Sequence, residues 1–517
     1  MSSSSIFNHV LGPVMHGPSS SHTAASFHIG RMARSILGCE PAEVEFAFDP
    51  SGSYAEVYAQ QGSDKAFAMG VMGWDITDSR FSQALVSAKD AGVKITFAVR
   101  PLQEQGHPNI VEVALTGEDC RKVRACARSV GGGAVVFTSI DGSLLSLKGD
   151  AWELILLAGE ESLPGLRSAA ERLTLAPGYP EERHQQGGGV LFHARCLDSP
   201  PPGVVDRMKA ERGVVNSTLA EPIFFPLRGK ALFKSALEMT AFAEKENISL
   251  GEAGIRYEAA LLGLSREEVI GEMIRRFRVM EDSVREGLSG KDLPMKLLRP
   301  VAGKIMKAEA NGSLAIGGIH TRAAARAMAV MHVNGAGGLV CAAPTGGSAG
   351  TIPGVAVTLK EEMGLADEDI ARVLFAASVV GVIVSERATF AAEVAGCQVE
   401  IGAAGAMAAA GVVEFAGGGA AHACSAAAIF FQNWMGSVCD PVQGYVEIPC
   451  HTRNAVAASS AFVCADLVLG GYENPLPLDE TIDAVLAVGK MLPRELRCTV
   501  LGGLSLCPSA KAMKVRN

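Results

Sequence analysis

Aromatic side chains are scarce in this chain of 517 residues. They make up 6% of it, whereas hydrophobic residues as a whole make up 48% and glycine alone occurs 58 times. A core with few large rings must be filled by small side chains, and we expect helices that approach one another closely. The length is sufficient for roughly two to four domains, each with a sizeable core.

An excess of basic residues is also lacking, and we expect neither a secretory leader nor a membrane-spanning segment. The net charge of −9 disfavours nucleic acid as a partner. The opening Met-Ser-Ser-Ser-Ser has no basic region followed by an apolar one, so we expect a cytoplasmic protein. The apolar stretches 373–384 and 403–431 are too short or carry polar residues such as Glu414, and they predict buried helices with no membrane partner.

Twelve cysteines are present, but no two of them form a CxxC pair. In a reducing compartment, thiols or metal ligands are expected rather than disulfides. Cys397, Cys439 and Cys450 stand in polar, turn-rich surroundings at spacings of 42 and 11 residues. These spacings are typical neither of a zinc ribbon nor of a bacterial ferredoxin.

Two interpretations of these three cysteines stay open. They are either buried structural residues, or ligands of an iron-sulfur cluster that are drawn from separate loops. A cluster with only three protein thiolates leaves one iron open as a Lewis acid. Cys341, in the glycine-rich loop 334–350, could replace one of the three, whereas Cys498 and Cys507 flank the Gly502-Gly503 turn with no role assigned.

Residues 1–150 predict an α+β domain. It begins with a serine-rich loop at 17–23, whose hydroxyls and following helix N-terminus could cradle a carboxylate or merely cap the helix. The expected helices are 23–37, 64–73, 78–91 and 118–127, the expected strands are 43–48, 93–100 and 110–116, and a hairpin with its turn at Asp141-Gly142 follows the glycines at 131–133.

Residues 151–225 predict a small domain with the order β-α-β-β-α-β, a ferredoxin-like topology. The strands are expected at 153–157, 189–197 and 214–220, with one more hidden in 174–188, and the helices at 163–173 and 202–212. Residues 226–517 predict an all-α domain, because apolar residues recur three and four apart at 229–246, 251–262, 265–287 and 321–332. Its loops are expected to bring the cysteines together.

Several motifs occur in order along the chain. They are the serine-rich loop 17–23, Gly52-Ser53-Tyr54-Ala55, Gly62-Ser63-Asp64-Lys65-Ala66, His107-Pro108-Asn109, Pro344-Thr345-Gly346-Gly347-Ser348-Ala349-Gly350, Gly396-Cys397-Gln398, the segment from Cys439 to Cys450, and Gly502-Gly503-Leu504. With them the chain resembles the iron-sulfur-dependent L-serine dehydratases, or L-serine ammonia-lyases, in the single-chain form with fused beta and alpha regions. The resemblance implies a beta-type domain at 1–150, an ACT-like domain at 151–225 and an alpha-type catalytic domain at 226–517.

The resemblance also implies a reaction, a cofactor and a site. L-serine would be converted to pyruvate and ammonia on a [4Fe-4S] cluster held by Cys397, Cys439 and Cys450, in a protein expected to be a homodimer. A base of near-neutral pKa is needed for the α-proton, and His22 and His107 are the candidates. The resemblance adds Gln61 and Asp64 to the catalytic set, and it implies substrate contacts from Ser19, Ser20, Ser21, Thr23, Asn109, Thr345, Ser348 and Arg387.

Two departures from the family pattern leave the substrate open. Gln61 stands where relatives carry histidine, and an amide cannot serve as a base near pH 7. Arg387 stands where relatives carry asparagine, and it could bind a second carboxylate or phosphate of a larger substrate, or pair with an acid such as Glu386 or Glu393. The alternatives are therefore a lyase for a β-thiol or dicarboxylic analogue, or a non-catalytic amino-acid sensor that uses residues 152–220.

For the ACT-like domain, the loop from Glu160 to Gly165 departs from the usual acidic-glycine loop. Effector binding and a purely structural or dimerising role both remain open. Against the sensor stands the cysteine triplet, which a sensor would not need.

Overall fold

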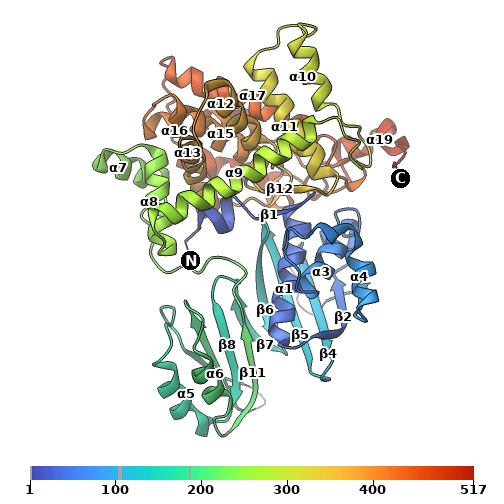
Figure 1. Cartoon of the computed structure of the whole chain (residues 1–517), viewed down its shortest axis with the longest axis vertical. Helices are drawn as coiled ribbons and strands as arrows, with labels where there is room; N and C mark the ends of the chain where they lie inside the picture. Colours follow the sequence, from blue (N-terminus) through green and yellow to red (C-terminus); the bar gives the residue numbers. More distant parts are fainter. Residues whose placement is uncertain (1–2, 103–106, 186–187, 517) are drawn as a thin grey trace.

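The computed structural model describes residues 3–102, 107–185 and 188–516. Figure 1 shows a large helical layer above two smaller units that each contain a sheet. The predicted multidomain architecture of mixed α and β structure is confirmed.

The first unit is a six-stranded sheet with helices packed on one face. Its strands run in the order β3-β2-β4-β5-β6-β7, and only β2 and β3 pair in parallel. Ile29 and Ile36 of α1 pack into one core cluster with Val113 and Phe137 of the sheet. The elements are α1 (Ala25–Leu37), β2 (Pro41–Phe48), α2 (Ser53–Val57), α3 (Ser63–Val71), α4 (Ala84–Asp90), β3 (Lys94–Val99), β4 (Ile110–Gly117), β5 (Lys122–Gly131), β6 (Ala134–Ile140) and β7 (Ser143–Leu147).

The helix expected at 118–127 is wrong, because most of that segment is strand β5. Val123, Ala125 and Ala127 are buried, and the residues between them are more exposed, which is the period of two that a strand requires. The hairpin that follows is as predicted. Asp141 and Gly142 both have positive φ, at 47° and 80°, as the tight turn between β6 and β7 demands.

The second unit has the predicted β-α-β-β-α-β order, including the hidden strand. The sheet order is β11-β8-β10-β9 with every pair antiparallel. Leu156 and Phe192 face the two helices, whereas Ile155 and Leu191 on the other face join the core of the first unit. The elements are β8 (Trp152–Ala158), α5 (Leu163–Ala170), β9 (Glu181–His184), β10 (Val190–Cys196), α6 (Pro202–Lys209) and β11 (Val214–Ala220).

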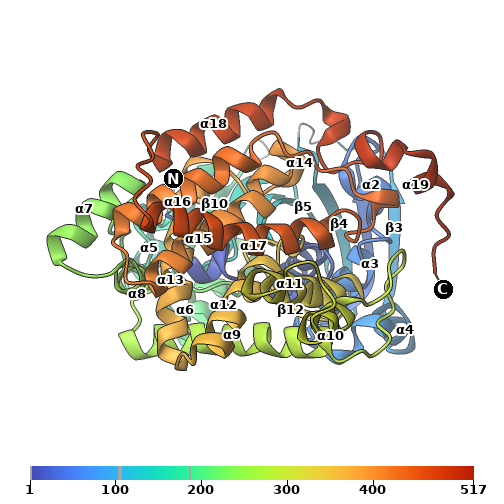
Figure 2. The same ribbon diagram turned by 90° about the horizontal axis from the view of Figure 1, so that it is seen from above.

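The remaining residues form the helical layer. All four helices expected from periodicity are present as α7, α8, α9 and α11, and a capping box of Ser265 and Glu268 begins α9. The elements are α7 (Ala236–Glu246), α8 (Leu250–Leu262), α9 (Arg266–Leu288), α10 (Ala302–Ala310), α11 (Ile319–Gly335), β12 (Leu339–Cys341), α12 (Thr351–Met363), α13 (Asp367–Arg387), α14 (Ala392–Ala395), α15 (Ile401–Phe415), α16 (Ala420–Trp434), α17 (Cys450–Leu469), α18 (Leu478–Met491) and α19 (Pro508–Ala512). Figure 2 shows α17 crossing the middle of this layer, with α18 along one edge.

Small side chains allow close contact within this layer. Residues 401–413 of α15 are all buried, and an ideal Cβ built on Gly405 would lie 1.9 Å from Cζ of Phe430. The expectation of closely packed helices is therefore confirmed. Among the helices of the described ranges, none has both the length and the apolar character required to cross a bilayer.

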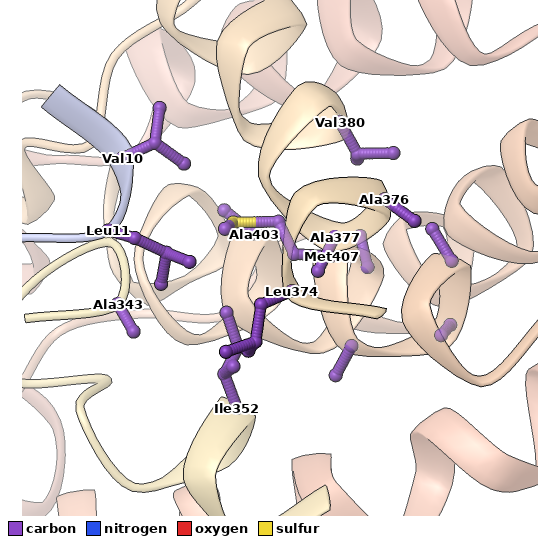
Figure 3. Packing of buried hydrophobic residues seen from close by; sticks show 14 of the residues in the cluster. Val10, Leu11, Ala343, Ile352, Leu374, Ala376, Ala377, Val380, Ala403 and Met407 are labelled. Atoms are coloured by element: carbon purple, nitrogen blue, oxygen red, sulfur yellow. The ribbon is translucent and has the colours of Figure 1, made fainter. Parts of the chain in front are cut away.

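The first residues of the chain lie in the helical layer, although they precede the sheet unit in sequence. Val10 and Leu11 pack beside Leu374 and Met407 (Figure 3). The buried Glu258 carboxylate accepts hydrogen bonds from the backbone of residues 6 and 7 at 2.8 and 2.9 Å. Strand β1 (Val14–His16) then pairs with β12. The serine-rich loop that follows is thereby fixed at the junction of the helical layer and the first unit.

Candidate metal and substrate site

Three helix boundaries bring Cys397, Cys439 and Cys450 together. Cys397 follows Gly396, whose φ of +77° makes the turn between α14 and α15, while Cys450 is the first residue of α17. Cys439 lies in the loop between α16 and α17, and its thiol is hydrogen-bonded to that of Cys397. One ligand atom each from Cys397, Glu400 and Cys439 lie within 4.8 Å of one another, so these side chains could hold a metal.

A narrow cavity, which we call the thiol cavity, lies where the cysteine loops meet the serine-rich loop. Hydroxyl, amide, carboxylate and thiol groups all contribute to its wall. Its polar and thiol lining residues are Ser19, Ser20, Ser21, Gln61, Thr345, Glu393, Glu400, Cys439, Cys450 and Cys498. The two motifs singled out at opposite ends of the sequence therefore form one site.

The thiols are buried together, and this sets their protonation. The hydrogen bond with Cys439 and burial both raise the pKa of Cys397, and burial raises that of Cys450. Arg453, one helical turn after Cys450, is the nearby cation. Its guanidinium donates to Sγ of Cys397 at 3.5 Å and to the carbonyl of Val438 at 2.8 Å.

Glu400 stands between the thiols and the glycine-rich loop. Its carboxylate accepts a hydrogen bond from Oγ1 of Thr345 at 2.5 Å, and Ser348 lies 3.1 Å behind that hydroxyl. Burial raises the pKa of Glu400 to about 7. An ideal Cβ on Gly347 would lie 2.6 Å from the same carboxylate, so a side chain at this position would displace it.

The serine-rich loop contacts both the cavity and a buried histidine behind it. Ser21 Oγ donates to Glu393 at 2.7 Å, and His22 Nδ1 lies 3.7 Å from the same carboxylate. Nε2 of His22 is 2.8 Å from Oγ of Ser53. Burial lowers the pKa of His22, and Glu393 partly offsets this. His22 therefore does not line the cavity itself, but its Nδ1 lies next to Ser21 and Glu393, which do.

Gln61 lines the cavity directly. Its Nε2 donates weakly to the carbonyl of Gly444 at 3.4 Å, and its Oε1 is buried without a hydrogen-bond partner in the described part of the chain. Thr23, predicted to contact substrate, instead donates to the backbone carbonyl of Gln61 at 2.7 Å. Asp64 lies in the first turn of α3 outside the cavity lining, and burial raises its pKa.

His107 and Arg387 lie outside the thiol cavity. His107 lines a second, open cavity of about 590 Å³, together with Arg494 and Arg497, and Glu393 belongs to both cavities. Asn109 is buried beside His107 with no described hydrogen bond to its Oδ1. Arg387 forms an ion pair with Asp483 at 2.5 Å. Of the two expectations for Arg387, pairing with an acid of the chain fits better than substrate binding, but the acid is neither Glu386 nor Glu393.

Cys341 is buried on β12 in the helical core and is not part of the cavity wall.

Sequence reasoning missed several residues of the site. Glu393, Glu400 and Cys498 line the cavity, and Arg453 and Asn454 support it. Asn454 donates to the carbonyls of Gly347 and Cys450 at 2.8 and 2.9 Å and thus joins two loops. Glu393 and Glu400 are close in sequence to Cys397, and Arg453 and Asn454 are close to Cys450. This proximity is the only signal that could have pointed to these four residues.

The donor set fits an iron-sulfur cluster better than a hard cation. Several thiols converge with one carboxylate, and soft thiolate ligands favour zinc or iron-sulfur centres over magnesium or calcium. Among the described cysteines every one is a free thiol. A bound metal ion would deprotonate thiols that burial otherwise keeps protonated.

Comparison with known proteins identifies the family of this chain. The family model described as "Serine dehydratase alpha chain" matches residues 207–505. The chain is 36% identical over 283 residues to the probable L-serine dehydratase alpha chain of Bacillus subtilis (strain 168), which covers 55% of this chain and 94% of that protein. It is 30% identical over 375 residues to L-serine dehydratase 1 of Escherichia coli (strain K12), covering 67% of this chain and 81% of that protein. The chain therefore belongs to the serine dehydratase family.

Proposed function

We propose that this protein converts L-serine to pyruvate and ammonia, by loss of water followed by hydrolysis of the resulting enamine, with a [4Fe-4S] cluster on Cys397, Cys439 and Cys450. The observation that carries the proposal is the thiol cavity, in which a hydroxyl-rich loop faces a group of cysteines. When bound, such a cluster supplies a Lewis acid that polarises the β-hydroxyl and stabilises the departing oxygen.

The serine-rich loop would hold the substrate carboxylate. Ser19, Ser20 and Ser21 line the cavity at the start of the helical turn that leads into α1, where hydroxyl and backbone N–H donors are available. The unpartnered Oε1 of Gln61 would accept a hydrogen bond from the substrate ammonium group. An amide can make this contact although it cannot act as a base near pH 7, so Gln61 fits a substrate-binding role.

A carboxylate in the cavity, rather than a histidine, would take the α-proton. Neither His22 nor His107 lines the thiol cavity, whereas Glu400 does so beside Cys397 and Cys439. Thr345 fixes one oxygen of Glu400 and leaves the other for a proton. His22 would act as a positioning residue, since it holds the Ser21 and Glu393 side chains through Nδ1.

The finer assignments are part of the same proposal. Residues 1–150, 151–225 and 226–517 would be the beta-type, ACT-like and alpha-type domains, and the four-stranded antiparallel sheet supports the second of these. Free cysteines throughout the described chain support a reducing, cytoplasmic compartment. A homodimer remains the expectation from family resemblance.

A dicarboxylic analogue is a second candidate substrate. The open cavity that shares Glu393 with the thiol cavity is lined by Arg494 and Arg497, and Nε of Arg497 is buried without a described partner. Those guanidinium groups, and not Arg387, are the cations that a second carboxylate could reach.

The test is an anaerobic assay of pyruvate release from reconstituted protein. L-serine should give pyruvate in the wild type, and Cys439→Ser should abolish the reaction while Cys341→Ser retains it. Release of a keto acid only from a β-hydroxy dicarboxylic amino acid would favour the second candidate. No release from either substrate by iron-loaded protein would refute the proposal.

A further inference from the structure

We propose that Phe390 limits the size of the substituent that the substrate can carry on its β-carbon. The inference rests on the proposed function, because it concerns the substrate of the same site. Its basis is the apolar part of the wall of the thiol cavity and the turn that supports it.

The residues that line the thiol cavity fall into two groups by their chemistry. Hydroxyl, amide and carboxylate side chains form the first group, to which the proposed function assigns the polar ends of the substrate. Apolar side chains form the second group, and they are those of Phe390, Ala392, Pro441 and Val446. These four side chains offer no hydrogen bond, so their contribution to recognition is the shape of the cavity. Phe390 is the largest of them, and it is buried.

A turn of three glycines supports Phe390 from behind. An ideal Cβ on Gly132 would lie 4.0 Å from Cδ2 of Phe390, and one on Gly131 would lie 3.2 Å from the backbone nitrogen of Ala391. Gly132 itself lines the cavity. The φ angles of Gly131, Gly132 and Gly133 are 102°, 62° and 91°, a conformation for which glycine is the ordinary residue. The turn therefore packs closely against residues 390 and 391.

Two hydrogen bonds hold this turn in place. Oγ of Ser129 donates to the carbonyl of Ser21 at 2.8 Å, and Nδ1 of His28 donates to the carbonyl of Gly133 at 2.7 Å. Ser21 belongs to the serine-rich loop, so the turn behind Phe390 is joined directly to the loop that would hold the substrate carboxylate. Because a close-packed wall cannot yield without a cost, it can discriminate between substrates by size.

The substituents of the β-carbon distinguish the candidate substrates. L-threonine has a methyl group where L-serine has a hydrogen, and a β-hydroxy dicarboxylic amino acid has a carboxylate there. One additional carbon in a tight apolar pocket changes kcat/KM by about 10- to 200-fold. A carboxylate would lose hydration beside the Phe390 ring without gaining a hydrogen bond from it. The inference therefore favours L-serine over both larger amino acids.

The test compares L-serine with L-threonine on full-length protein reconstituted anaerobically with iron and sulfide. L-threonine would lose water and its enamine would be hydrolysed in the same way, which gives 2-oxobutanoate and ammonia. Wild type should favour L-serine by about 10- to 200-fold in kcat/KM. Phe390→Leu and Phe390→Ala should each reduce this preference by about 10-fold, through faster turnover of L-threonine.

Val446→Ala is the matched control, because Val446 lines the same cavity and the substitution also removes apolar volume. It should change the preference by no more than about twofold. The preference is a ratio measured within one preparation, so incomplete loading with iron does not alter it. Circular dichroism verifies folding, and Phe390→Met retains most of the core volume if Phe390→Ala does not fold.

Equal kcat/KM for the two amino acids in wild type would overturn this inference and leave the proposed function standing. An unchanged preference in the folded Phe390 variants, or an equal loss of preference in Val446→Ala, would do the same. Release of no keto acid from either amino acid by iron-loaded wild type would overturn both proposals.

Discussion

The Arg453 guanidinium donates a hydrogen bond to the sulfur of Cys397 across 3.5 Å. It also donates to Asp440 at 3.1 Å and to the carbonyl of Val438, both in the loop that carries Cys439. Arg453 thus joins the loops that carry Cys397 and Cys439, and its positive charge lies beside the sulfur atoms that would be negatively charged as thiolates.

Replacement of Arg453 should therefore weaken the site without unfolding the chain. Arg453→Lys keeps the charge but loses the fork that reaches Cys397, Val438 and Asp440 together. We expect iron affinity and activity to fall by about 10- to 100-fold, as for other groups that orient metal ligands. Iron content after gel filtration is the measurement, and Arg387→Lys is the matched control. Equal iron retention in the two variants would contradict the role given to Arg453.

Glu400→Gln separates a base from a metal ligand. If Glu400 takes the α-proton, the variant should keep its iron while kcat on L-serine falls by about 100- to 10,000-fold. Loss of iron would instead make Glu400 a ligand. Glu393→Gln is the comparison: because Glu393 bonds Ser21 and adjoins His22, a fall of only about 10-fold is expected from one weakened hydrogen bond.

The two departures from the family pattern should behave differently. Gln61→Leu removes the amide oxygen from the cavity, and we expect KM for L-serine to rise by about 10-fold. Arg387→Asn should leave kcat and KM within about twofold, because Arg387 is paired with Asp483 away from the cavity. Steady-state kinetics under anaerobic conditions decide this. A larger effect of Arg387→Asn than of Gln61→Leu would show that the substrate reaches Arg387.

His28 should make folding stability depend on pH. Burial lowers its pKa to about 4, although the hydrogen bond to the carbonyl of Gly133 opposes the shift. Below pH 6.5 the imidazole of His28 is protonated in the unfolded chain, whereas in the folded chain it stays neutral down to about pH 4. The contribution of neutral His28 to the free energy of unfolding is therefore fully present above pH 6.5 and is lost as the pH falls towards 4.

His28→Asn retains a donor for Gly133 but does not titrate. Urea unfolding at pH 7.5 and pH 5 should show the stability difference between wild type and variant changing by about 2 kcal/mol in disfavour of wild type at pH 5. A difference that is the same at both pH values would contradict the assignment.

The sequence carried much of this architecture because its signals were local. Periodicity located α9, and alternation with turn residues located the β-α-β-β-α-β unit. The prediction from sequence failed at β5, where a helix was expected. Charged residues such as Arg124 occupy the outward positions of this strand, and they masked its alternation of buried and exposed residues. The meeting of the serine-rich loop with the cysteines followed from family resemblance, not from any local pattern.

The rest of the site depends on contacts between distant segments. Cys498 contacts Cys439, 59 positions earlier in the chain, through a backbone hydrogen bond beside the bridge between Cys439 and Arg497. Glu393 becomes part of the cavity because Ser21 lies opposite it. Such pairings have no periodicity and no spacing rule, so no local pattern distinguishes these residues from the other acids and cysteines of the chain.

The most direct test of the account is the iron and sulfide content of anaerobically purified protein and its cysteine variants. Wild type and Cys341→Ser should each carry about four irons with equal sulfide and a broad visible absorbance. Cys397→Ser, Cys439→Ser and Cys450→Ser should each lose the cluster. Full iron in those three variants, with loss in Cys341→Ser, would contradict the site described for this protein.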